Sequence, residues 1–221
     1  MVGNRIVVVC TANMIRSPFI AGLLRSRMQA FAGRGLEVDS AGTAARPGAG
    51  AAPEAIELGK TYGLDLAAHR TRRLDDGVLA TGDTVLCAER AHRRVVLDLR
   101  PDLLSSVFTV REFAHLVARV PERDAAGDWD GLVRAAGRAR LGGRVTPEAD
   151  DDVTDPIGCS QEVWTAFERQ ATQAVSAILA AIGSLPPEEW TDTSPPRPPA
   201  TRRENRMRLG APSSRRAART G

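Results

Sequence analysis

The chain has 221 residues, 43% of them hydrophobic, and a formal net charge of +3. This length fits one α/β domain with a substantial core plus an extension, and no apolar run approaches the ~18 residues that a membrane-spanning helix needs. Three cysteines without regular spacing argue against a disulfide scaffold, and no signal peptide precedes Val7, so we expect a cytoplasmic protein without membrane association.

The first strand and the first helix can be predicted from the N-terminal stretch. The β-branched run from Ile6 to Val9 predicts a strand that is buried on both faces, as in a parallel sheet, and that ends at Cys10. Ser17 followed by Pro18 is a helix-start signal, because the hydroxyl can cap and proline is tolerated in the first turn. The helix is expected to end at residues 33–35. Its expected apolar stripe consists of Ile20, Leu23, Leu24, Met28 and Phe31.

Strands and helices alternate through the middle of the chain. Strands are expected over residues 36–40, 83–87 and 107–110. Helices are expected over residues 51–62, 74–79, 88–92 and 111–117. This alternation is typical of a three-layer α/β fold, in which helices flank a parallel sheet.

The C-terminal part contains a polar segment, a long helix and a tail. Residues 121–152 predict a surface segment with at most one helix, over 129–141. An amphipathic helix is expected after Ser160. Its expected buried stripe consists of Val163, Trp164, Phe167, Ala171, Ala174, Val175, Ile178 and Ile182. Eight arginines and seven of the fourteen prolines fall after residue 184, so we place a folded domain at 1–184 and a disordered tail at 185–221.

The loop from Cys10 to Ser17 has the features of an anion cradle. Backbone N–H groups of the loop and of the first helical turn would point at one spot, where the helix dipole also favours negative charge. Such a site suits a thiolate as well as an oxyanion, so Cys10 is the candidate nucleophile, and Arg16 can grip two phosphate oxygens at once. The residues expected to bind phosphate are Thr11, Ala12, Asn13, Met14, Ile15, Arg16 and Ser17.

Cys87 has the same spacing to an arginine as Cys10, because Arg93 follows it by six positions, and an apolar run precedes it as well. The intervening segment is helix-forming and puts Glu89 next to the site of the anion, whereas Asn13 in the first loop tolerates the left-handed backbone that a cradle needs. We therefore favour Cys10 as the nucleophile. The alternative is that Cys10 is a buried structural cysteine.

Four groups of residues, in this order along the chain, resemble the low-molecular-weight protein tyrosine phosphatase family. They are Cys10 to Ser17, Ser40-Ala41-Gly42-Thr43, His69 with Arg72-Arg73-Leu74, and Asp155-Pro156 ahead of the last helix. The resemblance covers roughly residues 5–183. It implies a four-stranded parallel sheet in the order 2-1-3-4, with the cradle at the carboxyl end of the first strand.

The resemblance also implies roles for single residues. Cys10 would form a phosphocysteine, Arg16 would hold the equatorial oxygens, and Asp155 would protonate the leaving oxygen and then act as base for water. The residues implied to support the loop and the thiolate are Asn13, Ser17, Ser40 and His69. No metal or other cofactor is required. The remaining polar candidates are interpreted as structural, with Asp150, Asp151 and Asp152 as a solvated charge run and His92 and His115 as residues of helices.

One departure from the family concerns oxidation. Members often carry a second cysteine just before the arginine, where this chain has Ile15. Cys87 is expected to end the strand next to the first one, and parallel strands lie ~4.8 Å apart. We therefore hypothesise that Cys87 could act as the resolving thiol for oxidised Cys10.

A second departure concerns the substrate. Members that act on phosphotyrosine usually wall the cleft with aromatic rings, where this chain has Arg46, Pro47 and Ile157. Members that prefer phosphoarginine resemble one another in a threonine at the position of Met14. We therefore expect phosphotyrosine or another aryl phosphate on a phosphorylated protein, such as a tyrosine kinase.

Two other functions stay open. An arsenate reductase of the same fold, using a small-molecule thiol, would share the cradle, but Asp155-Pro156 favours a phosphatase because arsenate reduction has no alcohol to protonate. A non-enzymatic protein could bind anions or nucleic acid through the basic tail. No aromatic residue interleaves Arg202-Arg203 and Arg215-Arg216, so we expect no nucleic-acid partner.

Overall fold

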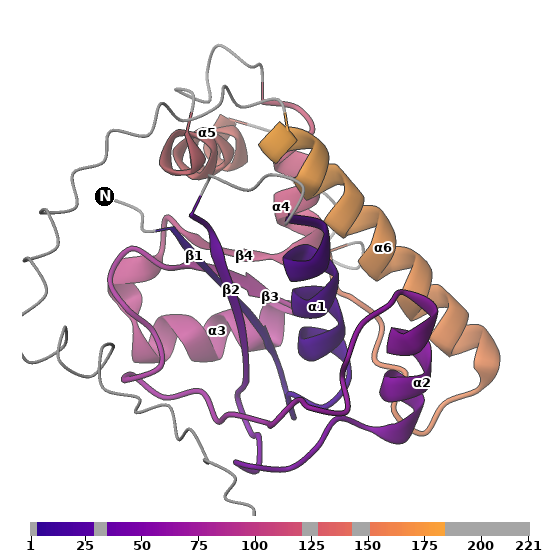
Figure 1. Cartoon of the computed structure of the whole chain (residues 1–221). Coiled ribbons are helices and arrows are strands. Elements are labelled where there is room, and N and C mark those ends of the chain that lie inside the picture. Colours follow the sequence, from indigo (N-terminus) through magenta and orange to yellow (C-terminus); the bar gives the residue numbers. More distant parts are fainter. Residues whose placement is uncertain (1–3, 29–34, 121–127, 143–150, 184–221) are drawn as a thin grey trace, which may run out of the picture. The chain divides into compact units, whose positions relative to one another are not determined.

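The computed structural model describes residues 4–28, 35–120, 128–142 and 151–183, and all of them belong to one compact unit (Figure 1). The tail predicted at 185–221 lies outside the described residues, so the domain boundary at 184 stays a prediction. The predicted end of the first helix at 33–35 also falls largely outside them.

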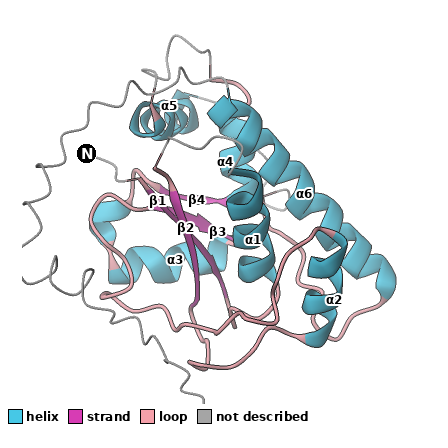
Figure 2. Cartoon of the chain, in the orientation of Figure 1, coloured by secondary structure: helices cyan, strands magenta, loops and turns pink. Residues whose placement is uncertain are grey.

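Four strands and six α-helices alternate along the described residues (Figure 2). The strands are β1 (Arg5–Cys10), β2 (Glu37–Gly42), β3 (Thr84–Cys87) and β4 (Val107–Thr109). The helices are α1 (Arg16–Met28), α2 (Pro53–Thr61), α3 (Arg90–Leu99), α4 (Val110–Val117), α5 (Trp129–Gly142) and α6 (Gln161–Gly183), and a short 3-10 helix, η2 (Pro101–Leu103), follows α3. Every strand predicted from the sequence is therefore confirmed.

The strands form one parallel sheet in the order β2-β1-β3-β4, as the family resemblance implies. β1 is a central strand, and its side chains from Ile6 to Cys10 are all buried, which explains the uninterrupted apolar run. Cys10 stands opposite Gly42 of β2, and Val9 stands opposite Cys87 of β3. This register sets which residues surround the loop that follows Cys10.

Two apolar clusters fill the space on either side of the sheet. The larger one lies on the face covered by α1, α4, α5 and α6, and the smaller one lies on the face covered by α3 and η2 (Figure 1). Within α6 the predicted stripe is buried from Phe167 to Ile182, whereas Val163 and Trp164 are half-buried. The three-layer architecture is therefore confirmed.

Two expectations for local structure are wrong. Residues 74–79 form a turn rather than a helix, because the Asp75 side chain accepts a hydrogen bond from the Val78 amide at 2.9 Å. The helix over 129–142 is also no surface element, since Trp129, Leu132 and Val133 are buried in the larger cluster. The Trp129 indole N–H donates to Thr84 Oγ1 of β3 at 3.0 Å, which ties α5 to the sheet.

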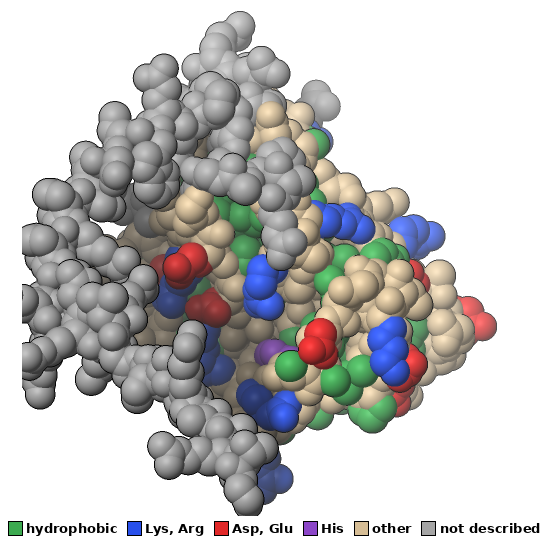
Figure 3. Space-filling model, in the orientation of Figure 1, with side chains coloured by type: hydrophobic (Ala, Val, Ile, Leu, Met, Phe, Trp, Pro, Cys, Tyr) green, Lys and Arg blue, Asp and Glu red, His purple; other side chains and the backbone are tan. Residues whose placement is uncertain are grey.

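The surface of the described residues mixes charges of both signs. On the face shown in Figure 3, basic and acidic side chains lie among small apolar areas. None of the described helices is both long enough and apolar enough to cross a membrane.

Candidate active site

The loop that joins β1 to α1 is a tight turn closed around the Cys10 sulfur. Asn13 has a φ of +56°, the left-handed conformation expected for it, and its backbone N–H lies 3.3 Å from Cys10 Sγ. Helix α1 begins at Arg16, so its free N–H groups and the positive end of its dipole lie at the same loop. The sulfur and the start of the helix are therefore brought together as the sequence predicts.

The side chain of Asn13 holds the loop from within. It is fully buried, and its amide nitrogen donates to Ser17 Oγ and to Ser40 Oγ, both at 2.9 Å. Its amide oxygen accepts the Arg72 backbone N–H at 2.8 Å. Both ends of the amide are thus satisfied, and the structure brings together three of the four residues that the sequence suggests as supports.

His69, the fourth of these residues, contacts the loop backbone. Its Nε2 lies 2.8 Å from the Asn13 carbonyl oxygen, which can only accept, so Nε2 carries a hydrogen. Burial lowers the pKa of His69, although its bond to the Asn13 carbonyl acts in the opposite direction. His69 therefore fixes the carbonyl of the residue with the left-handed backbone.

Ser17 can supply one hydrogen to the Cys10 sulfur. Ser17 Oγ lies 3.0 Å from Cys10 Sγ and 3.3 Å from the Ala41 carbonyl oxygen, and it accepts from Asn13. Its single hydrogen can point to the carbonyl while Cys10 is a thiol, and it can turn to the sulfur when Cys10 is a thiolate. The pair is thus arranged so that either charge state of the sulfur keeps a hydrogen-bond partner.

Gly42, at the end of β2, packs directly against the cradle loop. A Cβ at this position would lie 2.6 Å from the Thr11 carbonyl oxygen and 2.8 Å from the Asn13 backbone nitrogen. Both are backbone atoms of the cradle loop. A side chain at this position would therefore fit only if the loop backbone, with its N–H groups, moved. The glycine in the Ser40–Thr43 motif is therefore needed because the strand and the loop approach so closely.

Replacing Gly42 with alanine should deform the cradle. We expect weaker binding of inorganic phosphate and a loss of about 1–3 kcal/mol in the free energy of unfolding, as for other overpacked sites. Isothermal titration and urea unfolding would measure the two effects. Gly50→Ala is the matched control, because a Cβ there has no atom within 4 Å, and equal effects at both positions would contradict this role of Gly42.

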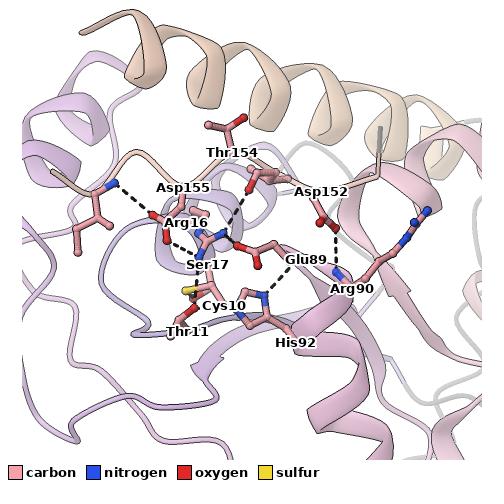
Figure 4. A network of polar contacts seen from close by, with 12 residues as sticks. Cys10, Thr11, Arg16, Ser17, Glu89, Arg90, His92, Asp152, Thr154 and Asp155 are labelled. Carbon is pink, nitrogen blue, oxygen red and sulfur yellow. Dashed lines mark hydrogen bonds and ion pairs between the residues drawn. The ribbon is translucent and has the colours of Figure 1, made fainter. Parts of the chain in front are cut away.

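The guanidinium of Arg16 is buried and forms ion pairs with two carboxylates. One nitrogen donates to Glu89 Oε1 and, at 3.3 Å, to the Val153 carbonyl oxygen. The other donates to Asp155 Oδ2 at 2.7 Å and lies 3.4 Å from Thr11 Oγ1 (Figure 4). The structure therefore places Asp155 at the arginine of the cradle, although the two residues lie 139 positions apart.

The segment that carries Asp155, residues 151–160, is anchored to the end of β3 and the start of α3. The Val153 N–H donates to the Ala88 carbonyl oxygen at 2.8 Å. Asp152 accepts the Arg90 backbone N–H at 2.9 Å (Figure 4). Asp151 is buried and forms an ion pair with the Arg90 side chain at 2.5 Å. The interpretation of Asp151 and Asp152 as a solvated charge run is therefore wrong, whereas Asp150 lies outside the described residues.

The sequence assigns no role at the site to Glu89, and it indicates His92 only as a structural residue of a helix, yet both residues contact the cradle. Both lie at the start of α3, where Glu89 is the N-cap and contacts Arg16. His92 is buried, and its Nε2 lies 2.8 Å from the hydroxyl oxygen of Thr11 in the cradle. The sequence indicates the segment after Cys87 only as a second, less favoured candidate for the cradle. In the structure it forms one wall of the site built on Cys10.

Cys87 does not reach the cradle. It pairs with Val9, so its side chain points to the same face as Val9 and to the opposite face from Cys10. The two sulfurs accordingly belong to different apolar clusters. Burial of Cys87 strongly raises the pKa of its thiol, which opposes the thiolate needed for exchange.

The resolving role proposed for Cys87 therefore conflicts with the structure. After mild peroxide treatment, we expect peptide mass spectrometry to find no Cys10–Cys87 disulfide in the folded protein. The same treatment in a denaturant that exposes both thiols is the control. Detection of that disulfide under native conditions would show that the sheet opens far more readily than its burial implies.

No group of three or more His, Cys, Asp and Glu side chains within residues 4–28, 35–120, 128–142 and 151–183 is arranged to hold a metal ion. The protein is a parallel α/β protein with an oxyanion cradle after its first strand. The cradle contains a buried cysteine and a buried arginine, and a carboxylate lies beside the arginine.

Comparisons with known proteins agree with this arrangement. The family model for low molecular weight phosphotyrosine protein phosphatase matches residues 5–123. A low molecular weight protein-tyrosine-phosphatase of Streptomyces coelicolor is 30% identical over 182 residues, which cover 80% of this chain and 93% of that protein. The chain therefore belongs to the low molecular weight phosphotyrosine protein phosphatase family.

Solved structures support the same fold. A low molecular weight protein tyrosine phosphatase from T. tengcongensis superimposes with a TM-score of 0.58 at 28% identity, covering 80% of this chain and 97% of that one. The YwlE arginine phosphatase from Geobacillus stearothermophilus superimposes with a TM-score of 0.57 at 26% identity, covering 82% and 95%. The solved structures that resemble this chain are thus named for two different phosphorylated residues, tyrosine and arginine.

Proposed function

We propose that this phosphatase hydrolyses aryl phosphate monoesters through a phosphocysteine on Cys10. The observation that carries the proposal is the position of Asp155, whose carboxylate lies 2.7 Å from the Arg16 guanidinium at the cradle. A nucleophile, a cation for the phosphoryl oxygens and an acid for the leaving group are therefore within one site. An arsenate reductase is not favoured, because the relatives reported above are named phosphatases.

In the first step the Cys10 sulfur attacks phosphorus and the bond between phosphorus and the leaving oxygen breaks. Asp155 gives its proton to that oxygen, which departs as an alcohol or phenol. The backbone amides of residues 11–16 and the Arg16 guanidinium stabilise the charge on the three other oxygens. The phosphoryl group is then bound to Cys10 and Asp155 is a carboxylate.

In the second step Asp155 takes a proton from water while the water oxygen attacks phosphorus. The phosphorus–sulfur bond breaks, and Cys10 leaves as a thiolate that the Ser17 hydroxyl and the Asn13 amide can stabilise, at 3.0 and 3.3 Å. Inorganic phosphate is released. The two steps restore every group, so the residues of the chain suffice for the cycle.

Substrate binding must change the partners of Arg16. The guanidinium forms ion pairs with Glu89 and Asp155, so a phosphate dianion has to replace at least one of them. Asp155 is the more exposed of the two, with 39% of its side chain accessible against 29% for Glu89. We infer that Asp155 leaves Arg16 on binding, becomes protonated and turns to the leaving oxygen.

The substrate is inferred to be phosphotyrosine or another aryl phosphate on a protein, for example on a tyrosine kinase in the cytoplasm. Met14 is half-buried in the cradle loop and packs on the larger apolar cluster, and Ile157 is 61% exposed two residues after Asp155. Apolar side chains in both segments suit an aromatic leaving group better than a guanidinium, which is charged. Phosphoarginine is the competing substrate, because a structural relative is named an arginine phosphatase.

Hydrolysis of a small aryl phosphate in the presence of a chelator tests the proposal. We expect turnover that vanadate inhibits, and a phosphotyrosine peptide should be a better substrate than a phosphoarginine peptide of the same sequence. If the protein releases no phosphate from the ester but consumes a small-molecule thiol when arsenate is added, it is a reductase instead. Absence of aryl phosphate turnover in the folded protein would refute the proposed function.

A further inference from the structure

The hydroxyl of Thr11 is the one side-chain oxygen of the cradle loop that lies beside both Arg16 and the helix α3. Thr11 is exposed, and its Oγ1 lies 2.8 Å from His92 Nε2 and 3.4 Å from an Arg16 nitrogen (Figure 4). The side chain therefore sits at the edge of the place that the phosphoryl group would occupy. Its hydrogen-bonding state depends on which nitrogen of His92 carries the proton.

The start of α3 determines that state. The Glu89 backbone N–H donates to His92 Nδ1 at 3.1 Å, as part of a reciprocal cap of the helix. Because a backbone N–H can only donate, Nδ1 is the bare nitrogen of a neutral imidazole and Nε2 carries the hydrogen. His92 is therefore the donor to Thr11 Oγ1, and the Thr11 oxygen is the acceptor.

The charges around His92 are consistent with a neutral ring. Burial lowers its pKa, and Arg16 of α1 acts in the same direction. The carboxylates of Glu89 on α3 and of Asp152 and Asp155 on the neighbouring segment act the other way. At neutral pH the ring thus keeps one hydrogen, which the cap directs to Thr11.

We propose that His92 and Thr11 form a side-chain arm of the anion cradle. Thr11 Oγ1 accepts from His92 and lies near a second donor, Arg16, so the remaining hydrogen of the hydroxyl is left for a third partner. A bound oxyanion between Thr11 and Arg16 supplies that partner. His92 is a positioning residue in this arrangement, because it acts on the anion through Thr11.

The arm adds one charge-assisted hydrogen bond to those of the backbone ring. It rests on the proposed function, since it requires that the cradle binds a phosphoryl group. Hydrogen bonds to charged groups are stronger than neutral ones, so loss of the arm should weaken phosphate binding by about tenfold.

Two substitutions of His92 separate its two hydrogen bonds. His92→Asn places an amide oxygen near the position of Nδ1, so it can keep the cap but cannot reach Thr11. His92→Gln places an amide N–H near the position of Nε2, so it can donate to Thr11 but loses the cap. Thr11→Val removes the hydroxyl itself, and His115→Gln, on the exposed face of α4, is the matched control for a histidine outside the site.

Dissociation constants for inorganic phosphate, kcat and KM with an aryl phosphate, and urea unfolding are measured for each variant. We expect His92→Asn and Thr11→Val to bind phosphate about tenfold more weakly, and His92→Gln to recover most of the affinity while losing stability. Combining Thr11→Val with His92→Asn should add little to either alone.

The outcome separates this inference from the proposed function. If the unsubstituted protein neither binds phosphate nor hydrolyses the ester, the proposed function fails. If it does both, and His92→Asn binds phosphate as tightly as the unsubstituted protein, the arm does not exist. An affinity loss that follows unfolding stability across all variants, and so is larger in His92→Gln than in His92→Asn, would reduce His92 to a helix cap.

Discussion

Cys10→Ser should lower the turnover of an aryl phosphate by at least about 10⁴-fold while inorganic phosphate still binds. Serine keeps the size of the side chain, and the Oγ of residue 10 can still bond to Ser17, so the amide ring around it should persist. An alcohol at this position has no base to activate it, because the groups that hydrogen-bond to the side chain of residue 10 are the hydroxyl of Ser17 and the backbone N–H of Asn13. The loss therefore concerns chemistry rather than binding.

Steady-state kinetics and phosphate titration on the same preparation separate these effects. Cys159→Ser is the matched control, since Cys159 is exposed and its sulfur donates to the backbone carbonyl oxygens of Asp155 and Ile157, which a serine hydroxyl can also do. Turnover retained by Cys10→Ser would assign the nucleophile to another group. Loss of phosphate binding together with turnover would mean that the sulfur holds the loop in shape, which is the structural alternative for Cys10.

Asp155→Asn should slow hydrolysis by about 10²–10⁴-fold for a poor leaving group, the usual range for a general acid. Asparagine can still occupy the space beside Arg16 and accept the Ile157 N–H, now found at 3.2 Å from Asp155 Oδ1. It has no proton to give to the departing oxygen. The defect should therefore grow with the pKa of the leaving alcohol and should nearly vanish for the most acidic phenols.

A series of aryl phosphates with leaving groups of different pKa measures this dependence. Asp98→Asn, an exposed carboxylate in α3, is the control and should leave the whole series unchanged. A uniform loss across the series would indicate that Asp155 acts on binding, for example by holding Arg16 in place. No loss at all would remove Asp155 from the mechanism.

The parts of the site that lie close together in the sequence could be predicted. The cradle, Cys10 and Arg16 follow from one strand, one short loop and one helix start, in which local backbone preferences decide the structure. The sheet order and the supporting roles of Ser40 and His69 follow from the family resemblance. The structure shows that sheet order and brings Ser40 and His69 into contact with Asn13.

The remaining parts depend on tertiary contacts that no local pattern specifies. Glu89 lies 73 residues from Arg16, and His92 lies 81 residues from Thr11, yet each pair is in contact. The sequence after Cys87 is that of an ordinary helix, and only the register of β1 against β3 turns its first residues toward the cradle. Burial of Asp151 likewise depends on its ion pair with Arg90, which lies 61 residues earlier in the sequence.

Helix α5 illustrates a different limit. Its apolar residues Trp129, Leu132, Val133 and Ala136 have the spacing of a buried helix face, but Gly and Arg between them dilute the signal. Residues 74–79 show the opposite case. Leu74 and Leu79 are apolar and buried, as in a helix, but the residues between them form a turn. Composition averaged over a segment thus conceals which few positions carry the burial.

The central claim is that the Cys10 sulfur becomes covalently bonded to phosphorus. Rapid acid quenching of Asp155→Asn during turnover of a good aryl phosphate, followed by peptide mass spectrometry, tests this directly, because loss of the base should slow the second step and allow the intermediate to accumulate. We predict a phosphoryl group on the peptide that contains Cys10, absent from the double variant that also carries Cys10→Ser. A phosphoryl group on any other residue, or turnover without a modified peptide at any quench time, would contradict the account.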